Sequence, residues 1–382
     1  MKVVLLGDPA SAHMMKWANG IKSRGVDVLV YGLTPVDKAQ YDDGIEIEVF
    51  KIPDSIKWKN DGNLLKSVYL LCLPHLKKTI KKFKCEILHG QSASSYGLIG
   101  ALSGFHPNIL SVWGNDVYIF PHKHILFKKL LMYSLSKADI ITSSSKTMAK
   151  YSRQFTDKEI LVTPGGIMLN KFMPLQRETD NYKANDIVVG TIKMMESKYG
   201  VEDILDAFNI LVKKYPDIPL KLLLVGRGSL IDTLKSKSIE YGIEEHVRIT
   251  GLIPFAQIPK YHNLLDIYLA PSTNDSESFG VGILEASACA KPVIVSNVGG
   301  LSEVVIDNET GFVVPPNNPK VLADKIETLV MDKELRHKMG KNGRKFVEEK
   351  YDYEKILDYI IEIYDSAIKK IPVKTGPFGI AN

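Results

Sequence analysis

Residues 277–285 read Glu277-Ser-Phe-Gly-Val-Gly-Ile-Leu-Glu285 and place two glutamates eight positions apart around a turn with two glycines. The apolar run 266–272 before them is typical of a buried parallel strand, and residues 279–290 are predicted to form a helix. A strand, a polar loop and a helix start in this order form an anion site, because the first helix amides lack internal partners and lie at the positive end of the helix dipole. We therefore expect a phosphate group to bind at this turn.

Four residues of the stretch have roles that fit such a ligand. Gly280 and Gly282 let a phosphate approach the backbone closely, because neither carries a Cβ. Glu285 lies about a turn and a half inside the helix, and helix side chains lean toward the N-terminus, so its carboxylate can reach a ribose diol. Glu277 precedes the turn, where it can accept hydrogen bonds from a sugar. The stretch therefore predicts a nucleotide-sugar site.

This pattern resembles the paired-glutamate signature of retaining glycosyltransferases, family 4 in particular, which have the GT-B fold. Five further segments resemble that family's motifs in order and spacing: 163–174 at the hinge between domains, 222–228, 247–254, 285–296 and 299–315. The similarity covers nearly all of residues 1–370 and is stronger in the second half. It implies an α/β protein with two doubly wound parallel-sheet domains, similar to Rossmann folds, that face each other across a cleft.

Size and composition agree with that expectation. A length of 382 residues exceeds what one hydrophobic core usually supports, so two domains are expected. An apolar share of 45% is ordinary for a soluble protein, and no run reaches the ~20 apolar residues of a membrane span. Residues 1–7 predict a buried strand rather than a signal peptide, because their apolar stretch is short. The three cysteines fit neither a disulfide framework nor a zinc site, which favours a cytoplasmic protein.

Apolar runs that are typical of strands alternate with helical patterns along the chain, as in parallel sheets covered on both faces. We expect strands near 2–7, 26–31, 86–89, 109–112, 139–142, 160–163, 186–192, 219–225, 247–250, 267–271 and 292–295. The resemblance divides the chain into an acceptor-binding domain, 1–168, and a donor-binding domain, 169–352. It also implies that an amphipathic C-terminal helix, 353–370, packs back on the first domain.

The net charge of +5 is unevenly distributed. Residues 1–170 hold 22 Lys and Arg against 14 Asp and Glu, whereas the remainder holds 27 against 30, so the first half suggests an anionic partner. Residues 64–84 end in a basic amphipathic helix, and further basic residues follow at 122–129. This surface predicts peripheral contact with an anionic membrane during work on a lipid-linked acceptor. A solvated helix face that covers the sheet is the alternative, and no nucleic-acid partner is expected.

Loss of a nucleoside diphosphate puts negative charge on the departing phosphate oxygen, so catalysis needs fixed positive charge and oriented amides there. The resemblance assigns this charge to Lys198. The family usually carries an arginine where Thr191 stands, and Lys193 is the candidate replacement because it shares a face with Thr191 on an extended strand. No Asp-x-Asp lies near the site, so we expect no metal and no cofactor besides the donor, a UDP- or GDP-sugar in the simplest case.

The resemblance also implies which other residues meet the donor. A tight strand-to-helix turn favours glycine in any protein, so Gly226 has a purely structural interpretation as well. The implied donor contacts are Lys193, Gly226, Arg227, Ile253, Phe279, Gly280, Val281 and Glu285.

The first domain departs further from the family. Many members place a histidine after the fourth strand, where this chain has Trp113 within Ser111-Val-Trp-Gly-Asn-Asp116. A subset that builds surface polysaccharides and glycolipids has this Trp-Gly-x-Asp form with a Ser-x-His near the start, here Ser11-Ala-His13. That similarity implies a catalytic-site role for His13 and contact of Asp116 with acceptor or sugar hydroxyls. Structural roles are the alternative for His13 and Trp113.

Three functions fit these observations. The first is a metal-independent retaining glycosyltransferase that uses Glu277 and Lys198 in transfer to a glycan or glycolipid acceptor. The second is a GT-B epimerase of NDP-sugars, which needs no acceptor. The third is a non-catalytic nucleotide-sugar binding protein, which the departures at Thr191 and Trp113 allow.

Overall fold

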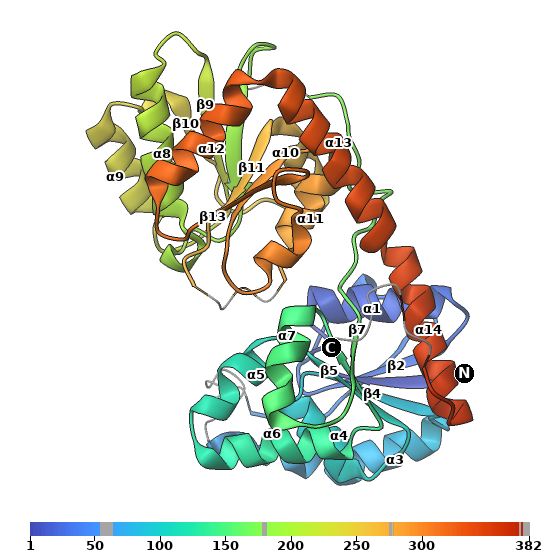
Figure 1. The fold of residues 1–382 in the computed structure, drawn as a ribbon. Coiled ribbons are helices and arrows are strands. Elements are labelled where there is room, and N and C mark those ends of the chain that lie inside the picture. The colour runs from blue at the N-terminus through green and yellow to red at the C-terminus, as the bar shows by residue number, and fades with distance from the viewer. Residues whose placement is uncertain (54–63, 178–181, 275–276, 278, 374–375, 377–382) are drawn as a thin grey trace. The chain divides into compact units, whose positions relative to one another are not determined.

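The structure, a computed structural model, describes residues 1–53, 64–177, 182–274, 277, 279–373 and 376. The chain divides into two compact units, one of residues 1–165 with 354–382 and one of residues 166–353. Each unit is built of one parallel sheet with helices on its faces (Figure 1).

Among its described residues, the first unit has the strands β1 (Lys2–Leu6), β2 (Asp27–Gly32), β3 (Glu46–Val49), β4 (Ile87–Gln91), β5 (Asn108–Val112), β6 (Ile140–Ser143) and β7 (Ile160–Val162). They form a seven-stranded sheet in the order β3-β2-β1-β4-β5-β6-β7, with every neighbouring pair parallel. The central strands β1, β4 and β5 are buried along almost their whole length, as expected when helices cover both faces of a parallel sheet. Polar residues gather where these strands end.

The first unit's helices are α1 (Ala12–Ser23), α3 (Leu73–Phe83), α4 (Ser95–Ser103), α5 (Asn115–Tyr118), α6 (Ile125–Lys137), α7 (Lys146–Ser152) and α14 (Tyr353–Lys369). Helix α7 begins where the Ser145 hydroxyl accepts a hydrogen bond from the Met148 amide, which satisfies one of the free N–H groups of a helix start. Helix α14 packs on the unit through the buried side chains of Ile360 and Tyr364.

The strands of the second unit that lie within the described ranges are β8 (Ile187–Ile192), β9 (Leu220–Val225), β10 (Val247–Ile249), β11 (Ile267–Ala270), β12 (Val293–Ser296) and β13 (Gly311–Val314). They form a parallel sheet in the order β10-β9-β8-β11-β12-β13. Strands β8 and β11 are neighbours although β9 and β10 separate them in sequence. The order of the strands therefore reverses between β8 and β11, and ligands of such sheets bind at the carboxyl ends of the strands at this point.

The second unit's helices are α8 (Val201–Lys214), α9 (Ile231–Tyr241), α10 (Ile258–Leu264), α11 (Val281–Ala288), α12 (Pro319–Met331) and α13 (Lys333–Lys350). Phe208 of α8 and Ile326 of α12 belong to a core cluster that also contains the strand residues Leu222 and Ile294. Short 3-10 helices join the elements of both units: η1 (Lys38–Gln40), η2 (Leu64–Cys72), η3 (Phe120–His122), η4 (Arg153–Phe155), η5 (Ser197–Tyr199), η6 (Glu244–His246), η7 (Phe255–Gln257) and η8 (Leu301–Val304).

The strands expected from apolar runs are confirmed, and two strands were not expected. Strand β3 is a short edge strand that reads Glu-Ile-Glu-Val, so it lacks an apolar run. Strand β13 is four residues long and begins directly after a turn. The predicted helix 279–290 is α11, which is shorter at both ends because Gly280 is its N-cap and Cys289 is its C-cap.

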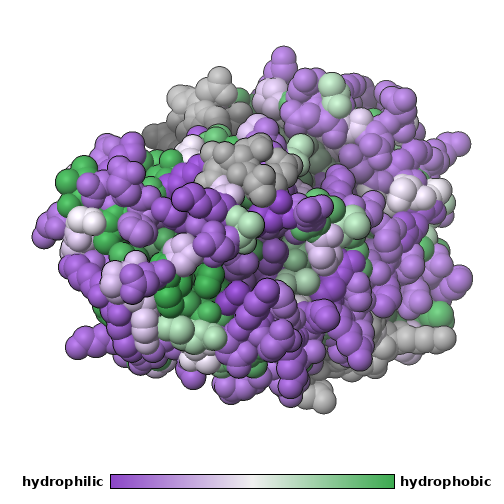
Figure 2. All heavy atoms as spheres, turned by 90° about the horizontal axis from the view of Figure 1, so that it is seen from above, coloured by the Kyte–Doolittle hydropathy of each residue, from purple (hydrophilic) through white to green (hydrophobic). Residues whose placement is uncertain are grey.

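On the face that Figure 2 shows, hydrophilic residues predominate and apolar residues form small groups. Within the described parts of the chain, no helix combines the length and the apolar character needed to cross a membrane.

Candidate active site

The segment between β11 and α11 forms the predicted strand, loop and helix start. Gly280 is the N-cap of α11 and has a φ of 81°, a conformation that glycine adopts without strain. Bonds to the Gly280 carbonyl start from the amides of Ile283 and Leu284, so the amides that precede Ile283 point out of the helix start. The ring of Phe279 packs edge-on against Tyr351, with 5.7 Å between centroids, and this contact anchors the loop in front of the helix.

A small open hollow lies at this helix start, at the carboxyl ends of β8 and β11. Its wall combines charged and hydroxyl groups with the backbone of the two glycines of the turn. The lining residues are Thr191, Lys193, Tyr199, Tyr268, Ala270, Ser272, Glu277, Gly280, Gly282, Ile283 and Leu301. All of them belong to the second unit.

Glu277 and Lys193 form an ion pair in this hollow. The Lys193 ammonium lies 2.8 Å from Glu277 Oε2 and 4.4 Å from the centroid of the Tyr199 ring. The backbone carbonyl of Glu277 accepts a hydrogen bond from the Gly300 amide at 2.8 Å. Glu277 is therefore held at two points, its side-chain carboxylate and its backbone carbonyl.

Lys198 lies beside the same aromatic ring. Its ammonium is 4.7 Å from the Tyr199 centroid, and its side chain is exposed. It is not among the lining residues of the hollow. Its carbonyl accepts a hydrogen bond from the Thr273 amide, which ties the loop after β8 to the loop after β11. Tyr199 thus brings both predicted cations to one edge of the sheet.

The second glutamate of the pair, Glu285, is bonded to a histidine that the sequence did not single out. Its Oε2 lies 3.3 Å from Nε2 of His262, a side chain in α10 with no exposed surface. In the described part of the structure, His262 Nδ1 has no hydrogen-bond partner. The imidazole is packed between the rings of Phe172 and Tyr268. Among the described residues, its polar contact is therefore the carboxylate of Glu285.

Tyr268 lies under the turn. Its hydroxyl is 3.4 Å from the Ile192 carbonyl, and a Cβ at Gly282 would come within 2.5 Å of it. Burial raises the pKa of the Tyr268 hydroxyl, and the negative charges of Glu285 and Glu277 act in the same direction. The hydroxyl is therefore a hydrogen-bond donor at neutral pH.

Close packing requires glycine at positions 226 and 228, in the turn after β9. A Cβ at Gly226 would lie 1.9 Å from the Lys193 carbonyl, and one at Gly228 would lie 2.2 Å from the Met195 carbonyl. The Arg227 side chain between them is exposed, and Ile253, in the loop after β10, is partly exposed. The glycines therefore let the loop that carries Lys193 cross the end of β9. Contact of Arg227 and Ile253 with the donor stays a prediction.

In the first unit, Asp116 organises the loop after β5. Its carboxylate accepts hydrogen bonds from the amides of Ala93, Trp113 and Gly114 at 2.7–3.2 Å. Burial raises the pKa of Asp116, whereas these N–H groups oppose that shift. The described contacts of Asp116 position the backbone around Trp113, and its contact with a hydroxyl of a substrate stays a prediction.

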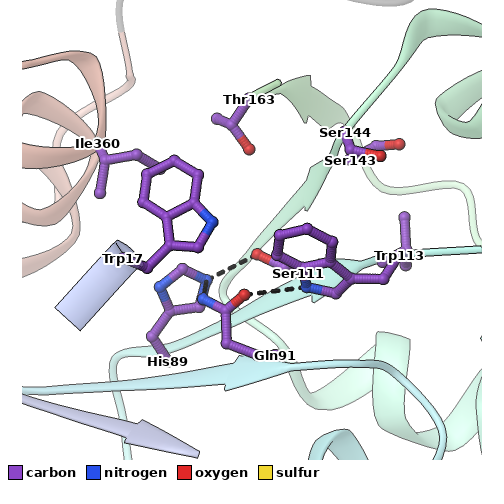
Figure 3. A pocket seen from close by; sticks show the side chains of 10 residues that line it. Trp17, His89, Gln91, Ser111, Trp113, Ser143, Ser144, Thr163 and Ile360 are labelled. Atoms are coloured by element: carbon purple, nitrogen blue, oxygen red, sulfur yellow. Dashed lines mark hydrogen bonds between the residues drawn. The ribbon is translucent and has the colours of Figure 1, made fainter. Parts of the chain in front are cut away.

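His13 and Trp113 lie together, with 5.4 Å between their ring centroids. His13 is exposed near the start of α1, and the Trp113 indole donates a hydrogen bond to Gln91 Oε1 at 2.9 Å. Figure 3 shows Trp113 and Trp17 turned toward a small pocket with His89, Gln91 and Ser111 at its base. The sequence did not predict the role of Trp17, because this residue lies in no recognisable motif.

His89 is a structural member of this pocket. Its Nδ1 lies 2.7 Å from the Tyr364 hydroxyl of α14. Its Nε2 lies 2.7 Å from Ser111 Oγ, a hydrogen bond that Figure 3 draws. Ser111 in turn bonds Thr142 at 2.7 Å. Burial lowers the pKa of His89 to about 3, so the imidazole is neutral at physiological pH. The network joins α14 to strands β4, β5 and β6.

Metal binding has no candidate centre in the parts of the chain that the structure covers. No group of three or more His, Cys, Asp or Glu side chains is arranged there to hold an ion. The three cysteines, Cys72, Cys85 and Cys289, are unpaired.

Two family models match this chain. The model of "Glycosyl transferases group 1" matches residues 173–346, and the model "Glycosyl transferase 4-like" matches residues 2–145. The first match includes Glu285 and all the residues that line the hollow, and the second includes His13, Trp113 and Asp116.

Relatives and solved structures agree with these matches. An uncharacterised glycosyltransferase of Methanocaldococcus jannaschii is 27% identical over 324 residues, which is 80% of this chain and 87% of that protein. A GDP-mannose-dependent alpha-(1-6)-phosphatidylinositol monomannoside mannosyltransferase of Mycolicibacterium smegmatis is 27% identical over 286 residues, 70% of this chain and 73% of that protein. HepE of Anabaena, solved with UDP and with UDP-glucose, superposes with TM-scores of 0.78 and 0.74 at 20% identity, over 96% of this chain and 100% of that one.

The two parallel-sheet units and these structural neighbours define the GT-B fold. The chain is a glycosyltransferase, an enzyme of the transferase class.

Proposed function

We propose that this enzyme is a retaining glycosyltransferase of family 4 that moves a sugar from an NDP-sugar to a glycan or glycolipid acceptor. The observation that carries the proposal is the hollow at the α11 helix start, where Glu277 and the amides of the turn meet Lys193 and Tyr199. HepE binds UDP-glucose and the Mycolicibacterium relative uses GDP-mannose, which supports a nucleotide-sugar donor. The cysteine content supports a cytoplasmic location.

The donor diphosphate would bind at the start of α11. The amides of Gly280 and Val281 and the positive end of the helix dipole favour an anion at this position. Lys198 would place its ammonium against the phosphate oxygen that gains charge as the bond to the sugar breaks. A group that stabilises only this developing charge raises kcat more than it lowers KM.

The two glutamates would hold the two sugars of the donor. Glu277 would accept hydrogen bonds from the transferred sugar, and the ion pair with Lys193 would orient its carboxylate. Glu285 would accept hydrogen bonds from the ribose diol. Fixed acceptors of this kind contribute by holding the reacting carbon in one place relative to the phosphate.

The acceptor would bind to the first unit, with His13 and Asp116 near its reactive hydroxyl. In the front-face reaction that the family resemblance implies, the bond from the anomeric carbon to the phosphate oxygen breaks as the acceptor oxygen bonds the same face. The acceptor proton passes to the departing phosphate oxygen. Retention of the anomeric configuration follows from attack on that face.

The test is a transfer assay in two stages. Thermal shift with UDP-, GDP- and ADP-sugars first identifies the donor, because a ligand of the folded state raises the melting temperature. NMR of the product then gives the anomeric configuration, and an inverted product would refute the retaining mechanism. Undiminished transfer after treatment with a chelator is expected for a metal-independent enzyme.

The same assay separates the alternatives. Donor incubated without acceptor should yield only slow hydrolysis, and a new sugar nucleotide would identify an epimerase. A protein that binds the donor and neither hydrolyses nor transfers it would be the non-catalytic binder.

A further inference from the structure

Helix α6 exposes a cluster of large apolar side chains. Ile125, Leu126, Met132 and Tyr133 are 62%, 45%, 42% and 37% exposed, respectively. Ile125 and Leu126 lie two helical turns before Met132 and Tyr133, on the same side of the helix. Leu131 and Leu135, on the other side, are buried. The core therefore accounts for the inner side of α6 and leaves its outer apolar side unexplained.

Lysines surround this cluster. Lys129 and Lys137 are exposed on the same side of α6, and the Lys137 ammonium lies 5.7 Å from the centroid of the Tyr133 ring. We call the six residues Ile125, Leu126, Lys129, Met132, Tyr133 and Lys137 the α6 face. An outer surface that mixes cations with large apolar groups is typical of a helix that lies in a membrane interface.

Helix α3 adds charge to this side of the unit. Figure 1 shows α3, α4 and α6 along one face of the sheet, and α4 contacts both of its neighbours. The apolar side of α3 is buried in the core through Leu76, Ile80 and Phe83, so the fold explains its amphipathic pattern. Its outer side carries the exposed residues Lys77, Lys78, Lys81, Lys82 and Lys84.

Acidic residues are scarce over the same region. Residues 64–138 contain ten lysines and only two acidic residues, Glu86 and Asp116. Asp116 is buried under backbone amides, and Glu86 accepts the Lys2 amide at the far end of α3. The surface of α3 and α6 therefore complements an anionic surface, and near a charged bilayer each lysine adds to the attraction.

We propose that the α6 face docks on the anionic phospholipids of a membrane, with its four apolar side chains among the headgroups and the lysines of α3 over the lipid phosphates. Such docking would place a glycosyltransferase at a lipid-linked acceptor. The proposal does not depend on the donor or on the reaction, because binding to vesicles is measured with neither donor nor acceptor.

The test is sedimentation of the full chain with two kinds of vesicle, one of phosphatidylcholine and one of phosphatidylcholine mixed with phosphatidylglycerol. We expect binding to the mixed vesicles that weakens as salt rises, because exposed charges are screened. The double variant Ile125→Ser/Leu126→Ser should bind at least about tenfold more weakly, from the apolar area it removes. Lys129→Glu should weaken binding about tenfold, since it removes one attractive charge and adds a repulsive one.

Ile239→Ser is the matched control, because Ile239 is 65% exposed on α9 of the second unit. It should bind vesicles like the wild type, and all variants should keep the wild-type melting temperature. A Tyr133→Trp variant should gain a blue-shifted fluorescence component on mixed vesicles, which reports insertion.

Three results would overturn the proposal. One is equal recovery of the wild type in the supernatant with both vesicles. Another is an equal loss of binding in Ile239→Ser and in Ile125→Ser/Leu126→Ser. The third is a dimer in solution that the double variant converts to a monomer while vesicle binding is unchanged, which would make the α6 face an interface between two copies.

Discussion

Lys193 Nζ lies 2.8 Å from Glu277 Oε2, so the lysine that we predict to replace the family's arginine is bonded to the first glutamate of the pair. The two side chains are 30% and 11% exposed, and water screens a pair in this setting less than one on the open surface. If Lys193 acts on the donor as proposed, it would do so through the orientation of Glu277, or it would exchange the carboxylate for a donor phosphate. The two possibilities differ in how substitutions at the two positions combine.

We expect Lys193 to act through Glu277. Lys193→Met should lower kcat/KM by the equivalent of about 2–4 kcal/mol of transition-state stabilisation, because it leaves a largely buried carboxylate without its partner. Glu277→Gln should have a similar cost, and the double variant should lose little more than either single variant, because residues that form one unit are not additive. Additive losses in this double-mutant cycle would instead indicate direct contact of Lys193 with the phosphate.

The Lys198 ammonium lies over the Tyr199 ring, 4.7 Å from its centroid. Lys198→Ala should cost about 2–4 kcal/mol of transition-state stabilisation, mainly in kcat, because the phosphate charge develops only as the bond breaks. Lys235→Ala, at an exposed lysine of α9, is the control and should leave both constants unchanged. Turnover of Lys198→Ala near that of the wild type would remove the assignment.

Gly200 holds the Lys198 loop against the loop after β11. It has a φ of 66°, and a Cβ there would lie 1.9 Å from the Pro271 carbonyl. Gly242 has a φ of 69° with open space around its Cα, so it shares the backbone conformation but not the contact. Gly242→Ala should lower the free energy of unfolding by about 1–2 kcal/mol, and Gly200→Ala by at least about 3 kcal/mol.

Denaturant titration of both glycine variants checks this difference. Because φ is nearly the same at the two positions, any excess loss in Gly200→Ala measures the contact with Pro271. Equal unfolding midpoints would mean that the two loops can separate without cost, and the position of Lys198 would then not depend on the loop after β11.

The sequence predicted best what a single continuous segment encodes. Strands with apolar runs and the turn at 277–285 belong to this kind, because backbone geometry and the local residues suffice to define them. Strand β3 was not predicted because it lacks an apolar run. An edge strand pairs through its backbone and can keep charged side chains.

The partners of the site residues could not be predicted, because they come from distant segments. Lys193 and Glu277 are 84 positions apart in sequence, and His262 reaches Glu285 from another helix. The partners of Asp116 could not be predicted for the same reason. Its motif suggests a ligand contact, whereas the structure shows that its carboxylate accepts hydrogen bonds from three backbone amides. Packing of the fold decides these pairings.

His89 should make stability depend on pH. Its pKa is lowered to about 3 in the folded chain by burial, against about 6.5 when unfolded, so the unfolded state binds more protons between these values. Its contribution to stability is therefore complete above pH 6.5 and is lost as pH falls toward 3. Between pH 6.5 and 5 the loss should reach about 2 kcal/mol.

The check is the difference in unfolding free energy between wild type and His89→Asn across this range. Asp116 titrates in both proteins, so its effect cancels in the difference. The wild type should lose stability more steeply on acidification than His89→Asn, and parallel curves would mean that the imidazole is protonated in the folded state.

His262 should position Glu285 for the donor ribose. The imidazole is fully buried, and its Nε2 has the Glu285 carboxylate at 3.3 Å as its polar contact. His262→Phe keeps the ring but removes the donor, so Glu285 loses the hydrogen bond that fixes its rotamer. His262→Gln retains an N–H group and serves as the conservative variant. The proposed contact of Glu285 with ribose can be measured by comparing a nucleoside diphosphate with its 2′,3′-dideoxy analogue.

The wild type should bind the ribose form about 10–100-fold more tightly than the dideoxy form, the worth of hydrogen bonds to a charged group. His262→Phe should narrow this ratio by about threefold or more, because a carboxylate without its orienting partner must be ordered by the ligand itself. His262→Gln should restore most of the ratio. A wild-type ratio near one would refute the ribose contact, whereas an equal loss of affinity for both nucleotides in His262→Phe would show that His262 only fills space behind the site.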